Sequence, residues 1–140
     1  MKFLAIDYGS KNIGIAISDP LGIVSKPLTT ISNTSTTKNV IHIINIADTE
    51  QVDKIVLGLA TDSQGSNYQA LKHHNKLINS LRNHSTIPIT FWDESDTSIR
   101  ANQLQTKKNK SQQSIHAISA AIILQDYLDT HSQVENPDND

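Results

Sequence analysis

Two short runs of apolar residues open the chain, and a polar turn separates them. Residues 3–19 are typical of two strands joined at Gly9-Ser10-Lys11, where we expect glycine to take the positive φ that a tight reversal needs. Asp19 to Gly22 is a second turn signal, and a third strand is expected from Ile23 to Ile31. The pattern therefore predicts three consecutive antiparallel strands.

The apolar period then changes, and helices alternate with strands along the rest of the chain. From Thr37 apolar residues recur every three or four positions, which is typical of a helix with one buried face. Residues 53–59 form a dense β-branched run that suits a buried parallel strand. A helix over 70–81, a strand over 87–92 and a helix over 114–128 follow. This order predicts an α/β domain whose five-stranded mixed sheet is flanked by helices.

Length and composition limit the class of protein. At 140 residues the chain is long enough for one core and too short for two substantial lobes. It has no cysteine, so any metal must be held by oxygen or imidazole, and we expect a cytoplasmic protein without a membrane segment. We place the folded domain at residues 1–129 and expect residues 130–140, which lack periodicity, to form a disordered acidic tail.

The net charge of -2 hides an uneven distribution. The first 125 residues carry 12 basic and 9 acidic side chains, whereas the residues after them are acidic and contain no Lys or Arg. A mildly basic body is compatible with an anionic polymer as partner. An ordinary mixed surface explains the same distribution as well.

Acidic side chains stand at the ends of two predicted strands. Asp7 interrupts the first strand, where an ionised carboxylate is costly unless a cation or several donors compensate it. It is a candidate metal ligand, and capping of the following turn is the alternative. Asp96 can cap a helix expected through residues 99–104. Asp93 and Glu94, which follow the fifth strand, are left without a structural explanation.

A basic loop and two histidines complete the candidate chemistry. The polar loop just before the final helix carries Lys107, Lys108 and Lys110. Such a loop can grip phosphates, and a solvated connector is the alternative. We expect His42 on the exposed side of its helix and His74 packed within an apolar stripe.

The order of elements, with acids after the first and fifth strands, resembles a ribonuclease-H-like fold. More narrowly, the chain resembles the RuvX family, also called YqgF, of pre-16S rRNA nucleases once proposed as Holliday junction resolvases. The motifs that carry the resemblance are Ile6-Asp7-Tyr8-Gly9-Ser10-Lys11, Ile13-Gly14-Ile15-Ala16-Ile17-Ser18-Asp19, Pro27-Leu28-Thr29-Thr30-Ile31, Ile55-Val56-Leu57-Gly58-Leu59, Gly65-Ser66, Asp93-Glu94 and Ser119-Ala120-Ala121-Ile122-Ile123-Leu124-Gln125-Asp126-Tyr127-Leu128. Taken jointly they are specific, and the resemblance spans nearly all of residues 2–129.

This resemblance implies a divalent-metal nuclease with three acidic ligands. The positions that match are Asp7, Glu94 and residue 116, where this chain has His116 in place of the family's aspartate. Carboxylates that converge from separate segments can hold Mg²⁺ or Mn²⁺ and support phosphodiester hydrolysis. Imidazole favours transition ions, so we expect a shift toward Mn²⁺. Lys11 and the three lysines before the final helix are the expected phosphate contacts.

The implied substrate is nucleic acid, with RNA favoured over DNA: the 5′ end of precursor 16S rRNA, processed during ribosome biogenesis. Holliday junction cleavage is the same chemistry on DNA and requires a symmetric dimer, and the sequence leaves monomer and homodimer open. His116, and Ser95 where the family usually has arginine, leave open a nucleic-acid-binding protein that has lost part of its site. The actin and sugar-kinase superfamily is disfavoured because its ATPases need two lobes.

Overall fold

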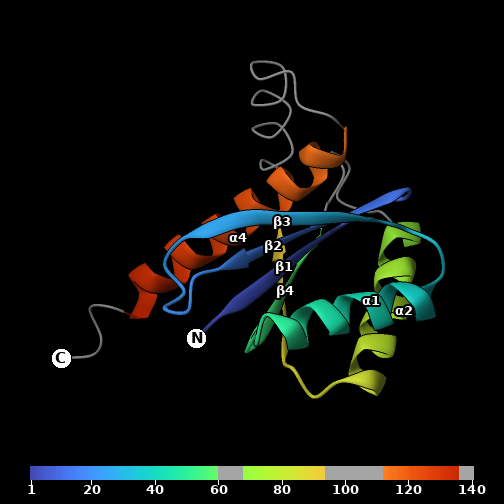
Figure 1. The fold of residues 1–140 in the computed structure, drawn as a ribbon, viewed down its shortest axis with the longest axis horizontal. Helices are drawn as coiled ribbons and strands as arrows, with labels where there is room; N and C mark the ends of the chain where they lie inside the picture. The colour runs from blue at the N-terminus through green and yellow to red at the C-terminus, as the bar shows by residue number, and fades with distance from the viewer. Residues whose placement is uncertain (60–67, 94–111, 136–140) are drawn as a thin grey trace.

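Five strands form one sheet with helices on both faces (Figure 1). The structure, a computed structural model, describes residues 1–59, 68–93 and 112–135. The sheet order is β3-β2-β1-β4-β5. The elements are β1 (Phe3–Tyr8), β2 (Asn12–Ser18), β3 (Ser25–Ser32), α1 (Thr36–Thr49), β4 (Lys54–Leu59), α2 (Tyr68–His84), β5 (Ile89–Asp93) and α4 (Gln112–Glu135).

The strand directions follow the expected meander. β1 pairs antiparallel with β2, and β2 pairs antiparallel with β3. β4 lies parallel to β1, and β5 lies parallel to β4. The expected five-stranded mixed sheet flanked by helices is therefore confirmed.

Side-chain alternation along the strands divides the core into two layers. Leu4 and Ile6 of β1 belong to the layer that packs under α1 and α2, together with the fully buried Leu77. Ala5 points to the other face, where α4 covers the sheet. Figure 1 shows α4 on one side of the sheet and the α1–α2 pair on the other. His42 is exposed on α1, as expected.

α4 lies close to the sheet because its inner face carries small residues. Ala120 is fully buried, and the Ala121 carbonyl accepts a hydrogen bond from Ser25 Oγ at 2.6 Å. Gln125 strengthens this attachment, since its Oε1 accepts from the Ser25 amide at 2.9 Å and its Nε2 donates to the Ile23 carbonyl at 3.0 Å. These contacts fix the helix against the start of β3.

α4 is longer than the sequence pattern indicates. It runs to Glu135, so the expected disordered tail is wrong for residues 130–135, and residues 136–140 lie outside the described residues. The centroid of the His131 ring lies 3.9 Å from that of the Tyr127 ring and 5.8 Å from that of the Trp92 ring. These contacts stabilise a part of α4 whose sequence has no apolar period. No described helix is both long and apolar enough to cross a membrane. The domain boundary at residue 129 stays a prediction.

The turn between β1 and β2 differs from the expectation. Gly9 does not have a positive φ; among the described glycines that conformation belongs to Gly22, at φ +71°. The Gly9 amide donates to the Asn12 carbonyl at 3.0 Å, and a Cβ on Gly9 would lie 2.6 Å from that oxygen. Glycine is therefore needed there for close approach rather than for backbone freedom.

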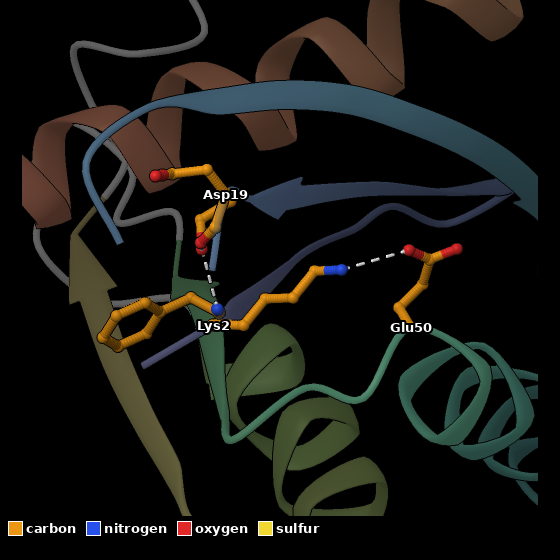
Figure 2. Close-up of polar contacts among 5 residues, drawn as sticks. Lys2, Asp19 and Glu50 are labelled. Atoms are coloured by element: carbon orange, nitrogen blue, oxygen red, sulfur yellow. Dashed lines mark hydrogen bonds and ion pairs between the residues drawn. The ribbon is translucent and has the colours of Figure 1, made fainter. Parts of the chain in front are cut away.

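Asp19, which Figure 2 shows near Lys2, organises the turn between β2 and β3 through its carboxylate. Its Oδ1 accepts hydrogen bonds from the amides of Val24, at 2.8 Å, and Ile23, at 2.7 Å. These donors hold the pKa of Asp19 below its ordinary value. Nearby, Lys2 Nζ lies 3.4 Å from Glu50 Oε1, and this ion pair joins the start of β1 to the end of α1.

Candidate active site

Asp7 stands at the end of the sheet where parallel strands β1, β4 and β5 terminate. It is the second-last residue of β1, is half-buried, and shares its face of the strand with Ala5, the face that α4 covers. Its partners on the neighbouring strands are Gly14 of β2 and Gly58 of β4. Because neither partner has a side chain, the space beside the carboxylate is not filled from the adjacent strands. Open α/β sheets bind ligands at this edge.

Gly14 also determines how closely α4 approaches. A Cβ built on Gly14 would overlap the carbonyl group of His116 and lie 3.0 Å from the Ala117 nitrogen. The main chain near the start of α4 therefore rests directly on β2 at the residue that pairs with Asp7. Two candidate residues that are far apart in the sequence, Asp7 and His116, are brought to one corner of the sheet.

The donor set at this corner fits a divalent cation in part. A carboxylate and an imidazole are ligands that Mn²⁺ and similar ions accept. The described residues contain no group of three His, Asp or Glu side chains that could hold a metal. Glu94, the third expected ligand, directly follows the last residue of β5 in the sequence and lies outside the described residues. Asp7 and His116 are thus the two of the three expected ligands that the structure describes.

The expected phosphate contacts are described only at Lys11. This side chain is exposed in the turn between β1 and β2, at the same end of the sheet as Asp7. The Lys11 carbonyl accepts a hydrogen bond from the Asn33 amide at 2.9 Å, which fixes the main chain of the turn. The three expected contacts before α4 lie outside the described residues, and they are Lys107, Lys108 and Lys110. Ser95 lies outside them too.

Sequence reasoning missed a cleft on the opposite face of β1. Its volume is about 480 Å³, and Tyr8, Asn33 and His74 are among the residues that line it. His74 is 6% exposed and packs edge-on against Tyr8, which confirms the expected packed histidine. Strand alternation was the available signal, because consecutive residues of a strand face opposite sides. With Asp7 on the α4 face, the next residue had to face α1 and α2.

Comparison with known proteins connects this fold and site to a family. A family model described as "RuvX: Holliday junction resolvase" matches residues 1–130. A protein of Sulfurihydrogenibium sp. (strain YO3AOP1) is 37% identical over 133 residues, covering 91% of this chain and 90% of that protein. One of Clostridium botulinum (strain Hall) is 33% identical over 137 residues, covering 95% and 100%. Both carry the name "Putative pre-16S rRNA nuclease".

Two solved structures share the fold at low sequence identity. Thermus thermophilus RuvC in complex with a Holliday junction substrate has a TM-score of 0.64 and 9% identity, covering 95% of this chain and 96% of its own. The fowlpox virus resolvase bound to Holliday junction DNA has a TM-score of 0.59 and 12% identity, covering 94% and 99%. These likenesses confirm the ribonuclease-H-like fold. Since the family match extends over almost the whole length and includes Asp7, Gly14 and the start of α4, the chain belongs to the RuvX family.

Proposed function

We propose that this chain is a metal-dependent nuclease that cleaves structured RNA at the 5′ end of precursor 16S rRNA, in the cytoplasm. A hydrolase acting on phosphodiester bonds is the enzyme class that its family indicates. The observation that carries the proposal is the corner of the sheet where Asp7 lies between two glycines and α4 packs on Gly14. At this corner strand pairing and the contact of α4 with Gly14 bring the main chain of residue 116 close to Asp7, which supports a ligand site shared by the two residues.

The roles of the residues follow from the elements that carry them. Asp7 is fixed by strand pairing on both sides, so its carboxylate can orient a cation without a large conformational cost. Glu94 and His116 would supply the other ligands, and His116 could instead carry a proton to or from the reacting oxygen. A divalent cation at such a set supplies Lewis acidity toward phosphate oxygens. Lys11 would hold the neighbouring phosphate.

His116 affects the choice of cation. Oxygen ligands suit Mg²⁺, whereas imidazole suits transition ions. A neutral imidazole also brings no negative charge, so the cation is held less tightly than by the aspartate that the family has there. We therefore propose Mn²⁺ as the better cofactor and Mg²⁺ as the weaker one.

Holliday junction DNA is the second candidate substrate, and the description of the matching family model favours it. The reacting groups at Asp7 would be the same, because RNA and DNA have the same phosphodiester linkage. The two candidates differ in how the strand reaches the site, and the names of the curated relatives favour RNA.

The test is cleavage of a labelled precursor 16S rRNA 5′ fragment in Mg²⁺, in Mn²⁺ and in chelator, beside a four-way DNA junction. The variants are Asp7→Asn, which keeps the size of the side chain, and His116→Asp. Lys26→Gln, an exposed change on β3 near the other end of the sheet, is the matched control. We expect wild type and control to cut the RNA in Mn²⁺ and Asp7→Asn to be inactive.

The two variants separate the parts of the proposal. A gain in Mg²⁺-dependent cutting by His116→Asp would support residue 116 as a ligand. Full cleavage by folded Asp7→Asn would show that Asp7 is not needed for cleavage and would refute its proposed role as a metal ligand. Cutting of the junction but not of the RNA would replace the RNA proposal by the DNA one, and no cutting of either would leave a protein that only binds.

A further inference from the structure

A cleft of about 480 Å³ opens on the face of β1 opposite Asp7. Its volume is within the range of about 300–1,000 Å³ typical of small-ligand sites. It lies between the turn after β1, the start of α1 and the side of α2. Tyr8 lines it, and because Tyr8 follows Asp7 in the same strand, the two side chains leave the end of β1 in opposite directions. The cleft therefore adjoins the candidate active site without being part of it.

An aromatic side chain forms part of the cleft wall. Tyr8 is half-buried, and its ring packs edge-on against that of His74, with ring centroids 5.5 Å apart and an interplanar angle of 70°. His74 is 6% exposed, so it holds the Tyr8 ring from the interior of the protein. Unpaired bases stack on aromatic rings of this kind in proteins that bind single strands.

The charge of the lining suits an anion beside that ring. Lys76 is the charged residue of the cleft, and none of its described lining residues is acidic. Hydroxyl groups of Ser10, Thr34 and Thr36 provide further donors and acceptors. An aromatic surface next to a cation and several hydroxyls matches the base and the phosphate of a nucleotide.

Hydrogen bonds hold the wall of the cleft in place before any ligand binds. Asn33 Nδ2 donates to the Gly9 carbonyl at 2.8 Å, and Asn39 Nδ2 donates to Asn33 Oδ1 at 2.8 Å. The Asn39 Oδ1 also accepts from the Thr34 amide at 3.1 Å. Asn39 is 1% exposed, so this chain of amides is anchored in the core. A preformed wall lowers the ordering cost of binding.

We propose that this cleft holds one unpaired nucleotide of the substrate strand, next to the phosphate that lies at Asp7. The inference rests on the proposed function, which brings the strand to this end of the sheet. A single strand that crosses the end of β1 presents a phosphate on the Asp7 face and an adjacent base on the Tyr8 face. A paired base cannot enter without being flipped out. The cleft therefore selects single-stranded or frayed RNA over the paired arms of a junction.

The first test measures binding without cleavage. Fluorescence anisotropy of a labelled single-stranded RNA is followed in chelator for wild type, Tyr8→Leu, Lys76→Gln and the control Lys26→Gln. We expect about a tenfold loss of affinity in Tyr8→Leu, the size that stacking of one base typically supplies. In Lys76→Gln the slope of log affinity against log salt should fall by about 0.7, the value for one lost phosphate contact on a single strand. Lys26→Gln should equal wild type.

The second test uses wild type and changes the RNA, so it does not depend on the folding of Tyr8→Leu. Abasic nucleotides are introduced one at a time along the strand. We expect one position to lose about tenfold in affinity, and the same position to lose nothing further in Tyr8→Leu. If no single position stands out, or if its loss is the same in Tyr8→Leu, the proposal is wrong. Displacement of the RNA by equimolar AMP would assign the cleft to a free nucleotide and overturn the proposal as well.

The outcomes of these measurements distinguish the nucleotide-binding cleft from the proposed nuclease function, so that either can be refuted alone. RNA binding that depends on Tyr8, without cleavage in any metal, would support the nucleotide-binding cleft and refute the proposed nuclease activity. Cleavage that depends on Asp7, with RNA binding unchanged in the Tyr8 and Lys76 variants, would support the nuclease activity and refute nucleotide binding in the cleft. Tighter binding of a fully paired junction than of the single strand, dependent on Tyr8, would overturn the inferred selectivity.

Discussion

Gly14→Ala is the smallest change that tests how the active-site corner is built. The added methyl group would overlap the carbonyl of His116 and lie 3.0 Å from the Ala117 nitrogen. Both obstacles are main-chain atoms of a helix, so no side-chain rotation can relieve the overlap. The start of α4 must withdraw by more than about 1 Å to restore an ordinary contact distance.

The cost of that withdrawal can be worked from what α4 covers. The helix buries Ala5, Ala16 and Val56 of the sheet, and these side chains are too small to follow it outward. A gap of about 1 Å already forfeits a quarter to a half of the dispersion energy of a contact. Overpacking at such sites costs about 1–3 kcal/mol, and we expect about 3 kcal/mol here because the shifted element is a whole helix end. Cleavage should fall further, by about 100-fold, because residue 116 moves relative to Asp7.

Urea unfolding followed by circular dichroism measures the free energy of unfolding, and cleavage is measured where each variant is folded. Lys26→Ala on β3 is the control, and as an exposed substitution it should change stability by less than about 0.5 kcal/mol. If the free energy of unfolding of Gly14→Ala is within about 0.5 kcal/mol of wild type, as for an exposed substitution, the close packing of α4 on β2 is refuted.

Three further changes test the connections around the site. Asn39→Ala should lower the free energy of unfolding by about 1–3 kcal/mol, because Asn33 and Thr34 lose a hydrogen-bond partner in the core. Urea denaturation measures this free energy, and an unchanged value would contradict the stabilising role of the hydrogen bonds among Asn33, Thr34 and Asn39. Gln51→Gly should raise stability by about 1 kcal/mol, since Gln51 has φ 58°, and a lower melting temperature would contradict this. The lowered pKa of Asp19 stabilises the fold above the ordinary aspartate pKa of about 3.9, and that contribution is lost as pH falls through the folded-state pKa. As pH falls through this acid range, the melting temperature should therefore decrease less in Asp19→Asn than in wild type. Equal decreases in the two proteins would contradict a stabilising role of the Asp19 carboxylate.

The pattern of the sheet could be predicted because each strand obeys a local rule. The alternation of β1 and β2, the turn residues after Asp19 and the dense run of β4 each indicate their element without knowledge of the rest. The end of α4 could not be predicted, since the stabilising contact of His131 with Tyr127 joins rings that no apolar period marks. The sequence indicates a turn at Gly9 but not the reason for glycine there, because the close approach depends on where the Asn12 carbonyl lies in space.

The sequence indicates candidate residues for the site, but it does not determine how the corner of the sheet that carries them is built. Asp7 was conspicuous because a carboxylate interrupts an apolar strand. That Gly14 and Gly58 flank it depends on the register of two neighbouring strands, and a single sequence does not fix register between strands. The cleft at Tyr8 depends in turn on how α1 and α2 pack against the same strand end.

At residue 116 the contact that maintains the fold is separate from the chemistry that we propose for the side chain. Its carbonyl group is what packs on Gly14, and a carbonyl is present whichever side chain residue 116 carries. The approach of α4 to β2 therefore does not require the imidazole, whereas the proposed preference for Mn²⁺ does. His116→Asp should leave the helix in place and alter only the ligand set, so a change in metal preference in that variant would report on coordination rather than on packing.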